Sequence, residues 1–297
     1  EVLCWGASDK GQLAAPSDSF DTVSVGNGFS CGVGSELREA ICWGDGAKAV
    51  TNDQNMGHYS LSAGPTSHCT INRWHDKAFG DYQATFCEGG GEHVGMDAFE
   101  GFLPVQSVGL NHACAQTRLG PVKVICWGNN EFGQTEVPAS LSALVLGDKH
   151  ACGSDGGRLQ CSGDNSYGQG TPPPPYIGPD ADYSELVAGK NHTCGRRGHH
   201  WQSGEIVCWG DNTMGQIEAP VGDHKKLISG DNHACAIHAT TKEIACWGDD
   251  SFGQTAAPTG AFKTLQAGKN HTCALADETG EVTCWGDGGS GQTTAPS

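Results

Sequence analysis

The chain has 297 residues, of which 45 are glycine, and its acidic residues outnumber its basic ones 34 to 17, giving a formal net charge of −17. This charge argues against nucleic acids, which proteins hold mainly through Lys and Arg, and against anionic membrane surfaces. Only 37% of the residues are hydrophobic and no apolar run reaches the roughly 20 residues of a membrane-spanning helix, so we expect no membrane insertion and an all-β fold of short strands joined by glycine turns.

The chain contains 15 cysteines, a number that indicates either metal sites or an oxidising compartment. Zinc sites usually show Cys-x-x-Cys pairs, and the sequence has none. We therefore expect disulfides, no bound metal, no cofactor, and a secreted or cell-surface location. No signal peptide is visible at Glu1, so we take the start of the chain as already processed or trimmed.

Three short markers recur along the chain in a fixed order. The first is Cys-Trp-Gly, complete in six copies and altered in two. Its copies lie 38, 45, 39, 35, 47, 38 and 38 residues apart, which fits a four-stranded propeller blade of about 40 to 45 residues. The eight copies begin at Cys4, Cys42, Cys87, Cys126, Cys161, Cys208, Cys246 and Cys284.

The second and third markers alternate with the first. The second reads Gly-Leu-Asn-His-Ala-Cys or Gly-Lys-Asn-His-Thr-Cys in its clearest copies. The third is Gly-Gln followed by a proline, as in Gly133-Gln134 with Pro138. The seven copies of the second marker end at Cys31, Cys69, Cys114, Cys152, Cys194, Cys235 and Cys273.

These ordered markers extend over essentially the whole chain and resemble the repeat of the regulator-of-chromosome-condensation superfamily. That superfamily includes the ectodomains of crinkly-type plant receptor kinases and a propeller-type β-lactamase inhibitory protein. The cysteine-bearing form of the repeat is more similar to these extracellular members than to the nuclear one. The resemblance implies that residues 1–297 form a single seven-bladed β-propeller.

The paired cysteines predict a hairpin in each blade. Each second-marker cysteine precedes a first-marker cysteine by 8 to 17 intervening residues, with a turn between them. Opposite positions of a hairpin bring two Cβ atoms close enough for a disulfide after a small shift. We therefore expect one intra-blade disulfide per blade: Cys31–Cys42, Cys69–Cys87, Cys114–Cys126, Cys152–Cys161, Cys194–Cys208, Cys235–Cys246 and Cys273–Cys284.

Residues 1–20 hold a surplus half-unit, because the first marker has eight copies and the second only seven. Cys4 in this segment has no hairpin partner. Either an upstream blade was removed, or this first strand completes the ring and Cys4 is free or bonded to another chain.

Two hairpins are longer than most and carry residues typical of binding sites. Aromatic and arginine side chains in exposed loops are common in binding hot spots. We interpret both hairpins as candidate binding loops, the alternative being that they only cover the rim. The first carries Trp74, His75, Phe79, Tyr82 and Phe86, and the second carries Arg196, Arg197, His199, His200 and Trp201.

The repeated polar and aromatic positions have a structural interpretation. A ring of histidines suggests a metal funnel, but each one occupies the same place in its own repeat, which favours packing and loop hydrogen bonds. The repeated tryptophans are expected to fill the core in the same way. The Gly-Asp-Asn loops, such as residues 210–216, lack the carboxylates of a calcium loop and are expected to be turns. The histidines are His68, His112, His150, His192, His233 and His271.

Three segments are candidates for glycosylation. Asn191 and Asn270 each begin an Asn-His-Thr sequon inside the second marker. The run Pro172, Pro173, Pro174 and Pro175 resembles hydroxyproline-glycosylated segments of plant and green-algal wall proteins, with a plain stiff spacer as the alternative.

The sequence contains no nucleophile elbow, no His-Glu-x-x-His and no phosphate-binding glycine loop, so we expect the protein not to be an enzyme. We expect an extracellular interaction or structural-assembly module that binds protein or glycoprotein partners, copies of itself included, through propeller loops and rim. The alternative is a soluble secreted ligand binder, such as an enzyme inhibitor or a glycan receptor.

Overall fold

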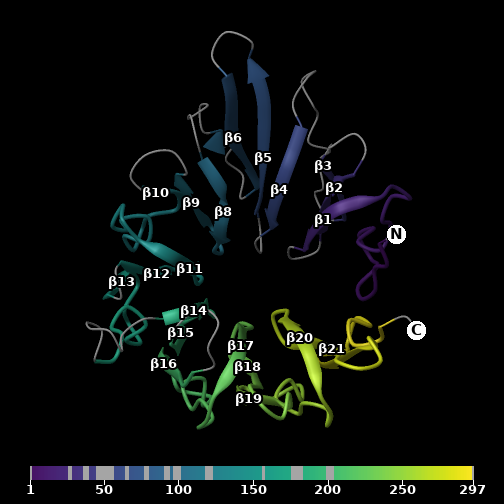
Figure 1. Ribbon diagram of the computed structural model, residues 1–297, viewed down its shortest axis with the longest axis vertical. Helices are drawn as coiled ribbons and strands as arrows, with labels where there is room; N and C mark the ends of the chain where they lie inside the picture. The colour runs from purple at the N-terminus through teal and green to yellow at the C-terminus, as the bar shows by residue number, and fades with distance from the viewer. Residues whose placement is uncertain are drawn as a thin grey trace. The chain divides into compact units, whose positions relative to one another are not determined.

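The computed structural model describes most of the chain, and between residues 57 and 108 it describes the backbone only. The described residues are 2–25, 29–35, 40–44, 57–63, 67–76, 80–89, 94–95, 102–117, 123–155, 158–174, 183–198 and 204–295. The chain divides into two compact units, residues 1–130 with 138–140 and residues 131–137 with 141–297. Figure 1 colours the chain from purple at the N-terminus to yellow at the C-terminus.

The described residues of the first unit form three antiparallel sheets. The described strands of the first sheet are β1 (Phe20–Val25), β2 (Phe29–Gly34) and β3 (Ala40–Gly44). The second sheet has β4 (Gly57–Ala63), β5 (Ser67–Asp76), β6 (Gly80–Gly89) and β7 (Val94–Gly95). The third has β8 (Phe102–Val108), β9 (His112–Thr117) and β10 (Val124–Gly128).

The second unit contains four antiparallel sheets, each built from three strands that are consecutive in the chain (Figure 1). They are β11 (Ser142–Leu146), β12 (His150–Asp155) and β13 (Arg158–Gly163); β14 (Tyr183–Ala188), β15 (His192–Arg197) and β16 (Ile206–Gly210); β17 (His224–Ser229), β18 (His233–His238) and β19 (Ile244–Gly248); and β20 (Phe262–Ala267), β21 (His271–Ala276) and β22 (Val282–Gly286).

Six of the seven sheets in the described residues have three strands, where the repeat length led us to expect four. The segment after each Gly-Gln marker runs as turns and loop instead of pairing as a fourth strand. Prolines such as Pro220 and Pro258 in this segment have no amide hydrogen to donate to a ladder. The all-β fold is confirmed, and the number of blades stays a prediction.

Six of the expected disulfides are present. In each, the two cysteines stand directly opposite each other in neighbouring strands, with Cα atoms 4.0 to 4.1 Å apart. Cys69 and Cys87 are likewise opposite in the β5–β6 register, but their side chains lie outside the described part of the structure. The six confirmed pairs are Cys31–Cys42, Cys114–Cys126, Cys152–Cys161, Cys194–Cys208, Cys235–Cys246 and Cys273–Cys284.

Neighbouring sheets of the second unit pack through their first strands, with β14 between β11 and β17, and β17 beside β20. Apolar side chains fill the space between sheets: Trp285 packs with Ile228, Phe262 and Leu265. The indole N–H of Trp285 donates to the Gln254 carbonyl at 2.9 Å, and Trp209 and Trp247 make the same bond to the preceding repeat. The tryptophans are therefore core residues, as predicted.

The histidines of the second marker connect adjacent sheets. His150 Nε2 lies 2.9 Å from the Thr193 hydroxyl, and His233 Nε2 lies 2.9 Å from Thr272. Where the next sheet has alanine in place of this threonine, His192 instead contacts the Ser229 hydroxyl at 3.1 Å. The structural interpretation of these three histidines is confirmed.

The glycine three residues before each histidine makes room for the imidazole ring. A Cβ atom on Gly189 would lie 2.6 Å from His192 Nδ1 and 2.7 Å from the Gly230 carbonyl oxygen. Glycines 147, 230 and 268 face their own histidines in the same way. The Gly-x-x-His spacing of the marker is therefore a packing requirement.

Candidate interaction surface

Four large apolar side chains are exposed at the same position of four successive repeats in the second unit. Their exposed fractions range from 39% to 52%. Each directly precedes the Gly-Gln marker, in loops 131–136, 164–171, 211–218 and 249–256, which we call the Gly-Gln loops. We call the four side chains the loop face: Phe132, Tyr167, Met214 and Phe252.

Each Gly-Gln loop is held by its own glutamine, which is almost fully buried. The Gln169 side-chain oxygen accepts the amide N–H of Tyr167 at 2.8 Å, and its Nε2 donates to Asp164 at 3.2 Å. Asp164 also accepts the amide of Ser166. The glycine between the exposed residue and the glutamine has a positive φ, +84° at Gly168, which favours glycine.

The other three loops repeat this arrangement. The amides of Phe132, Met214 and Phe252 donate to the side-chain oxygen of the glutamine two residues later, at 2.7 to 2.9 Å. Since the next sheet's tryptophan also donates to the glutamine carbonyl in three of the four loops, the exposed side chains are presented by rigid backbone. Preorganisation of this kind lowers the entropic cost of binding a partner.

The Gly-Gln loops are strongly acidic. They contain seven carboxylates and no Lys or Arg: Glu131, Glu136, Asp164, Asp211, Glu218, Asp249 and Asp250. Asp164, Asp211, Asp249 and Asp250 accept amides of their own loops. The exposed carboxylates are Glu131, Glu136, Glu218 and Asp250. The loop face therefore combines apolar side chains with an excess of negative charge.

The turns between the first and second strands of each sheet lie beside the Gly-Gln loops and carry charges of both signs. Backbone hydrogen bonds join these turns in sequence, from Asp148 N to Lys190 O, from Lys190 N to Asp231 O and from Asp231 N to Lys269 O. Lys269 also pairs with the Asp231 carboxylate at 3.5 Å. Burial raises the pKa of both Asp148 and Asp231, and the neighbouring lysines oppose that rise.

Both sequon asparagines lie in these turns. Asn191 and Asn270 are half-buried, and their carbonyl oxygens accept the amides of Asp211 and Asp287, which directly follow the third strands of their sheets. The sequon threonines, Thr193 and Thr272, are fully buried and bind the histidines of the preceding sheet. These two threonines therefore contribute to sheet packing, and glycan occupancy stays a prediction.

The predicted hairpin between Cys69 and Cys87 is present as β5 and β6. Trp74 and Tyr82 are directly opposite in its register, as are His75 and Asp81. Phe86 pairs with Thr70. The side chains of these residues, and all of Phe79, lie outside the part that the structure describes, so the proposed binding role is untested there.

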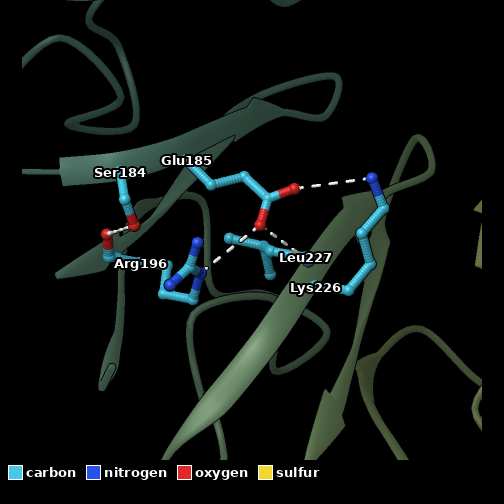
Figure 2. Close-up of polar contacts among 5 residues, drawn as sticks. All are labelled: Ser184, Glu185, Arg196, Lys226 and Leu227. Atoms are coloured by element: carbon cyan, nitrogen blue, oxygen red, sulfur yellow. Dashed lines mark hydrogen bonds and ion pairs between the residues drawn. The ribbon is translucent and has the colours of Figure 1, made fainter. Parts of the chain in front are cut away.

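The second predicted hairpin differs from expectation at its arginines. Arg196 was expected in an exposed loop, but it lies within strand β15 and is only 4% exposed. Its Nε donates to Glu185 at 3.4 Å, and Glu185 also accepts the Leu227 amide at 3.2 Å and pairs with Lys226 at 3.6 Å (Figure 2). This cluster joins β14 and β15 to β17 of the next sheet.

Arg197 also contacts groups of its own sheet. It lies 6.0 Å from the Tyr183 ring centroid, donates to the Tyr183 hydroxyl at 3.4 Å and pairs with Glu205 at 3.9 Å. His199, His200 and Trp201 lie outside the described residues. Sequence reasoning placed these arginines outside the sheet because it followed the cysteine spacing and could not show how far the strands extend.

Among the described residues, Cys4 forms no disulfide, and it is half-buried. In the proline run, Pro172 and Pro173 are partly buried and Pro174 is exposed, while Pro175 is not among the described residues.

Within the described ranges, no three His, Cys, Asp or Glu side chains are grouped so that they could hold a metal ion. The Gly-Asp-Asn loops are turns, as expected. The described part of the chain also has no helix with the length and hydropathy needed to cross a membrane.

The loop face was missed in the sequence because each of its residues is unremarkable alone. A signal appears when the loops are aligned on Gly-Gln: the preceding position holds Phe, Tyr, Met and Phe in four successive repeats. The same position holds Lys10 and Ser290 in the terminal repeats. An apolar residue surrounded by Asp, Asn, Ser and Gly has no turn-forming role, which is the physical reason to suspect a contact surface.

The repeated sheets define a β-propeller, and solved structures support this class. The ectodomain of the Physcomitrella patens receptor kinase CR4 is similar, with a TM-score of 0.65 and 23% identity over 91% of this chain and 74% of that one. The CRINKLY WD40 ectodomain of the Arabidopsis thaliana receptor kinase ACR4 gives 0.62 and 22% over 90% and 95%. Prp20p of Saccharomyces cerevisiae gives 0.56 and 12% over 97% and 81%.

The particular kind of repeat is also identified. Residues 229–254 and 262–292 match the Regulator of chromosome condensation (RCC1) repeat. The predicted resemblance to this superfamily is confirmed, and the chain is a β-propeller in which two segments match the RCC1 repeat.

Proposed function

We propose that the protein is a non-enzymatic extracellular interaction or assembly module that binds a protein partner through the loop face. The observation that carries the proposal is the repetition of an exposed apolar side chain on four rigid loops. Aromatic residues and methionine are enriched in protein–protein interfaces.

The relatives are consistent with this function at a coarse level. The two plant structures are receptor kinase ectodomains, and Prp20p is described by its binding to Gsp1p and histones. Prp20p is therefore an example of a similar propeller that binds protein partners. The six disulfides favour an oxidising location for this chain.

Carbodiimide cross-linking of the native protein in its extracellular fraction tests the proposal, because the reagent joins carboxylates to lysines of a bound partner. We expect partner cross-links at Glu131, Glu136, Glu218 and Asp250 in the Gly-Gln loops. The exposed Glu205, Glu243 and Glu281, near the opposite ends of the sheets, are internal controls. Cross-links concentrated on the controls, or spread evenly over both sets, would contradict the proposal.

Binding of the cross-linked partner, once purified, gives the quantitative test. Replacing all four loop-face residues by serine is expected to weaken the affinity at least about tenfold, since buried apolar anchors dominate interface energies. The double variant Val221→Ser and Val282→Ser removes exposed apolar side chains elsewhere and should leave the affinity unchanged. Equal losses in the two variants would exclude the loop face as the binding site.

A further inference from the structure

A lysine ammonium of the same chain lies over one aromatic ring of the loop face. The Lys149 ammonium lies 4.5 Å from the centroid of the Phe132 ring. A Lys or Arg within about 6 Å of an aromatic face is attracted by the ring's quadrupole. Lys149 comes from the turn beside the loop, directly before His150.

The same turn-and-loop geometry recurs at Tyr167 and Phe252 with a neutral residue in place of the lysine. Asn191 and Asn270 occupy the position of Lys149, directly before their histidines. All three carbonyls accept the amide of an aspartate that follows the third strand, at 2.8 to 2.9 Å.

The surroundings of the glycine before that aspartate also show that the turn and the loop are placed alike in these repeats. A Cβ atom on Gly210 would lie 2.5 Å from Asn191 O and 3.1 Å from Gln169 Cβ. One on Gly286 would lie at the same distances from Asn270 O and Gln254 Cβ. The turn residue and the loop glutamine are therefore placed alike in both repeats.

We propose that Tyr167 and Phe252 each bind a lysine or arginine side chain of a basic polypeptide segment, in the position that Lys149 takes over Phe132. This inference rests on the proposed function, because it specifies the partner of the loop face. The two rings are about half exposed, and their own loops hold three carboxylates and no basic residue, with Lys190 and Lys269 in the adjacent turns. A cation bound there is attracted by both the ring and the surrounding charge.

The spacing of the two rings favours a polypeptide as the ligand. The loops of Tyr167 and Phe252 are separated by the loop that presents Met214, so one small cation contacts one ring only. A chain with spaced basic residues and apolar contacts between them matches the sequence of Tyr, Met and Phe on the surface. The net charge of −17 repels nucleic acids and favours such a partner.

The test places a lysine of the protein itself at each of the two proposed cation positions. In the double variant Asn191→Lys and Asn270→Lys, each new lysine should cover its ring as Lys149 covers Phe132. The matched control, Asn232→Lys with Ser290→Lys, adds the same two charges beside Met214 and in residues 287–293 of the last repeat, which include no aromatic residue. All proteins are made in a host without N-glycosylation, because the first variant removes both sequons.

The probe is a fluorescent dodecapeptide of alternating lysine and glycine, with binding followed by anisotropy at 150 mM salt. We expect the Asn191→Lys and Asn270→Lys variant to weaken binding about 5- to 30-fold more than the control, as the loss of two cation–π contacts implies. Tyr167→Leu with Phe252→Leu, which changes no charge, should weaken binding by a similar factor. Urea unfolding of every variant confirms that the fold is intact.

Three results would overturn the inference. They are equal losses in the variant and its charge-matched control, unchanged binding in the leucine variant, and no binding of the peptide to the unaltered protein. Any of these, together with native cross-links at the Gly-Gln loops, would leave the proposed function standing with a different partner chemistry. Cross-links at the control carboxylates would instead refute the proposed function itself.

Discussion

The two ends of the sheets in the second unit follow different plans. At the end that carries the Gly-Gln loops, every sheet repeats the same turn, the same buried glutamine and the same link to the next sheet. At the opposite end, the hairpins differ in length and are held by individual ion pairs, such as Arg196 with Glu185 and Lys242 with Asp277. The end that carries the Gly-Gln loops has the same backbone contacts in each repeat, and only the exposed residue before Gly-Gln differs. We call it the constant end, and we call the opposite end the variable end.

Acid should weaken the constant end first. Burial, together with a neighbouring histidine, lowers the pKa of His192 and His233 to about 4. Between about pH 6.5 and 4 the unfolded chain therefore binds more protons than the folded one, and stability falls as the pH drops through this window. The expected loss is roughly 3 kcal/mol for each histidine.

Urea unfolding at several pH values between 7.5 and 4 measures this loss. His233→Gln removes one titrating group and should flatten the dependence, even if it lowers stability at neutral pH by losing the Thr272 contact. A stability that does not change between pH 6.5 and 4 would show that these histidines are not held neutral by the fold.

The packing of the constant end can also be broken by one methyl group. Gly189→Ala places a Cβ atom against the His192 ring and the Gly230 carbonyl, and we expect a loss of about 3 kcal/mol in the free energy of unfolding. Gly168→Ala is the matched control, because a Cβ there meets nothing and only the backbone strain of its positive φ remains, about 1 kcal/mol. Similar losses in both variants would contradict the packing argument.

The variable end should respond to single charges. Glu185→Gln removes the counter-charge of Arg196, which is buried, and we expect a loss of about 2 kcal/mol. Lys226→Ala removes the more exposed partner of the same carboxylate and should change stability by less than about 0.5 kcal/mol. If the two variants cost the same in urea unfolding, the cluster in Figure 2 is only a surface network.

Much of the frame could be predicted from the sequence because it is repeated. The spacing of the cysteines predicted the hairpins, and the fixed place of His150 and Trp209 in their markers indicated packing roles that the structure confirms. Because several copies share the same pattern, variation in one copy does not obscure it, and each copy supports the interpretation of the others.

The candidate site was harder to predict, for two physical reasons. Arg196 is buried because Glu185 and Leu227 reach it from other strands, and the cysteine spacing does not record such contacts between strands. Tyr167 and Phe252 are exposed because, in each loop, the side chain of the glutamine two residues later occupies the interior. Their apolar character alone favoured burial, and only the loop geometry shows that they face solvent.

The glutamine-to-tryptophan bonds also locate where one module ends and the next begins. The tryptophan indole of each of these sheets donates to the glutamine carbonyl of the loop that precedes the sheet. If the chain is divided directly after a third strand, this loop therefore stays with the sheet that follows it. The division of the chain agrees, since residues 131–137 group with the sheets that follow them and not with β10. A chimera or a circular permutation should therefore be joined just before a Gly-Gln loop, so that each transplanted module keeps the loop that its own tryptophan binds.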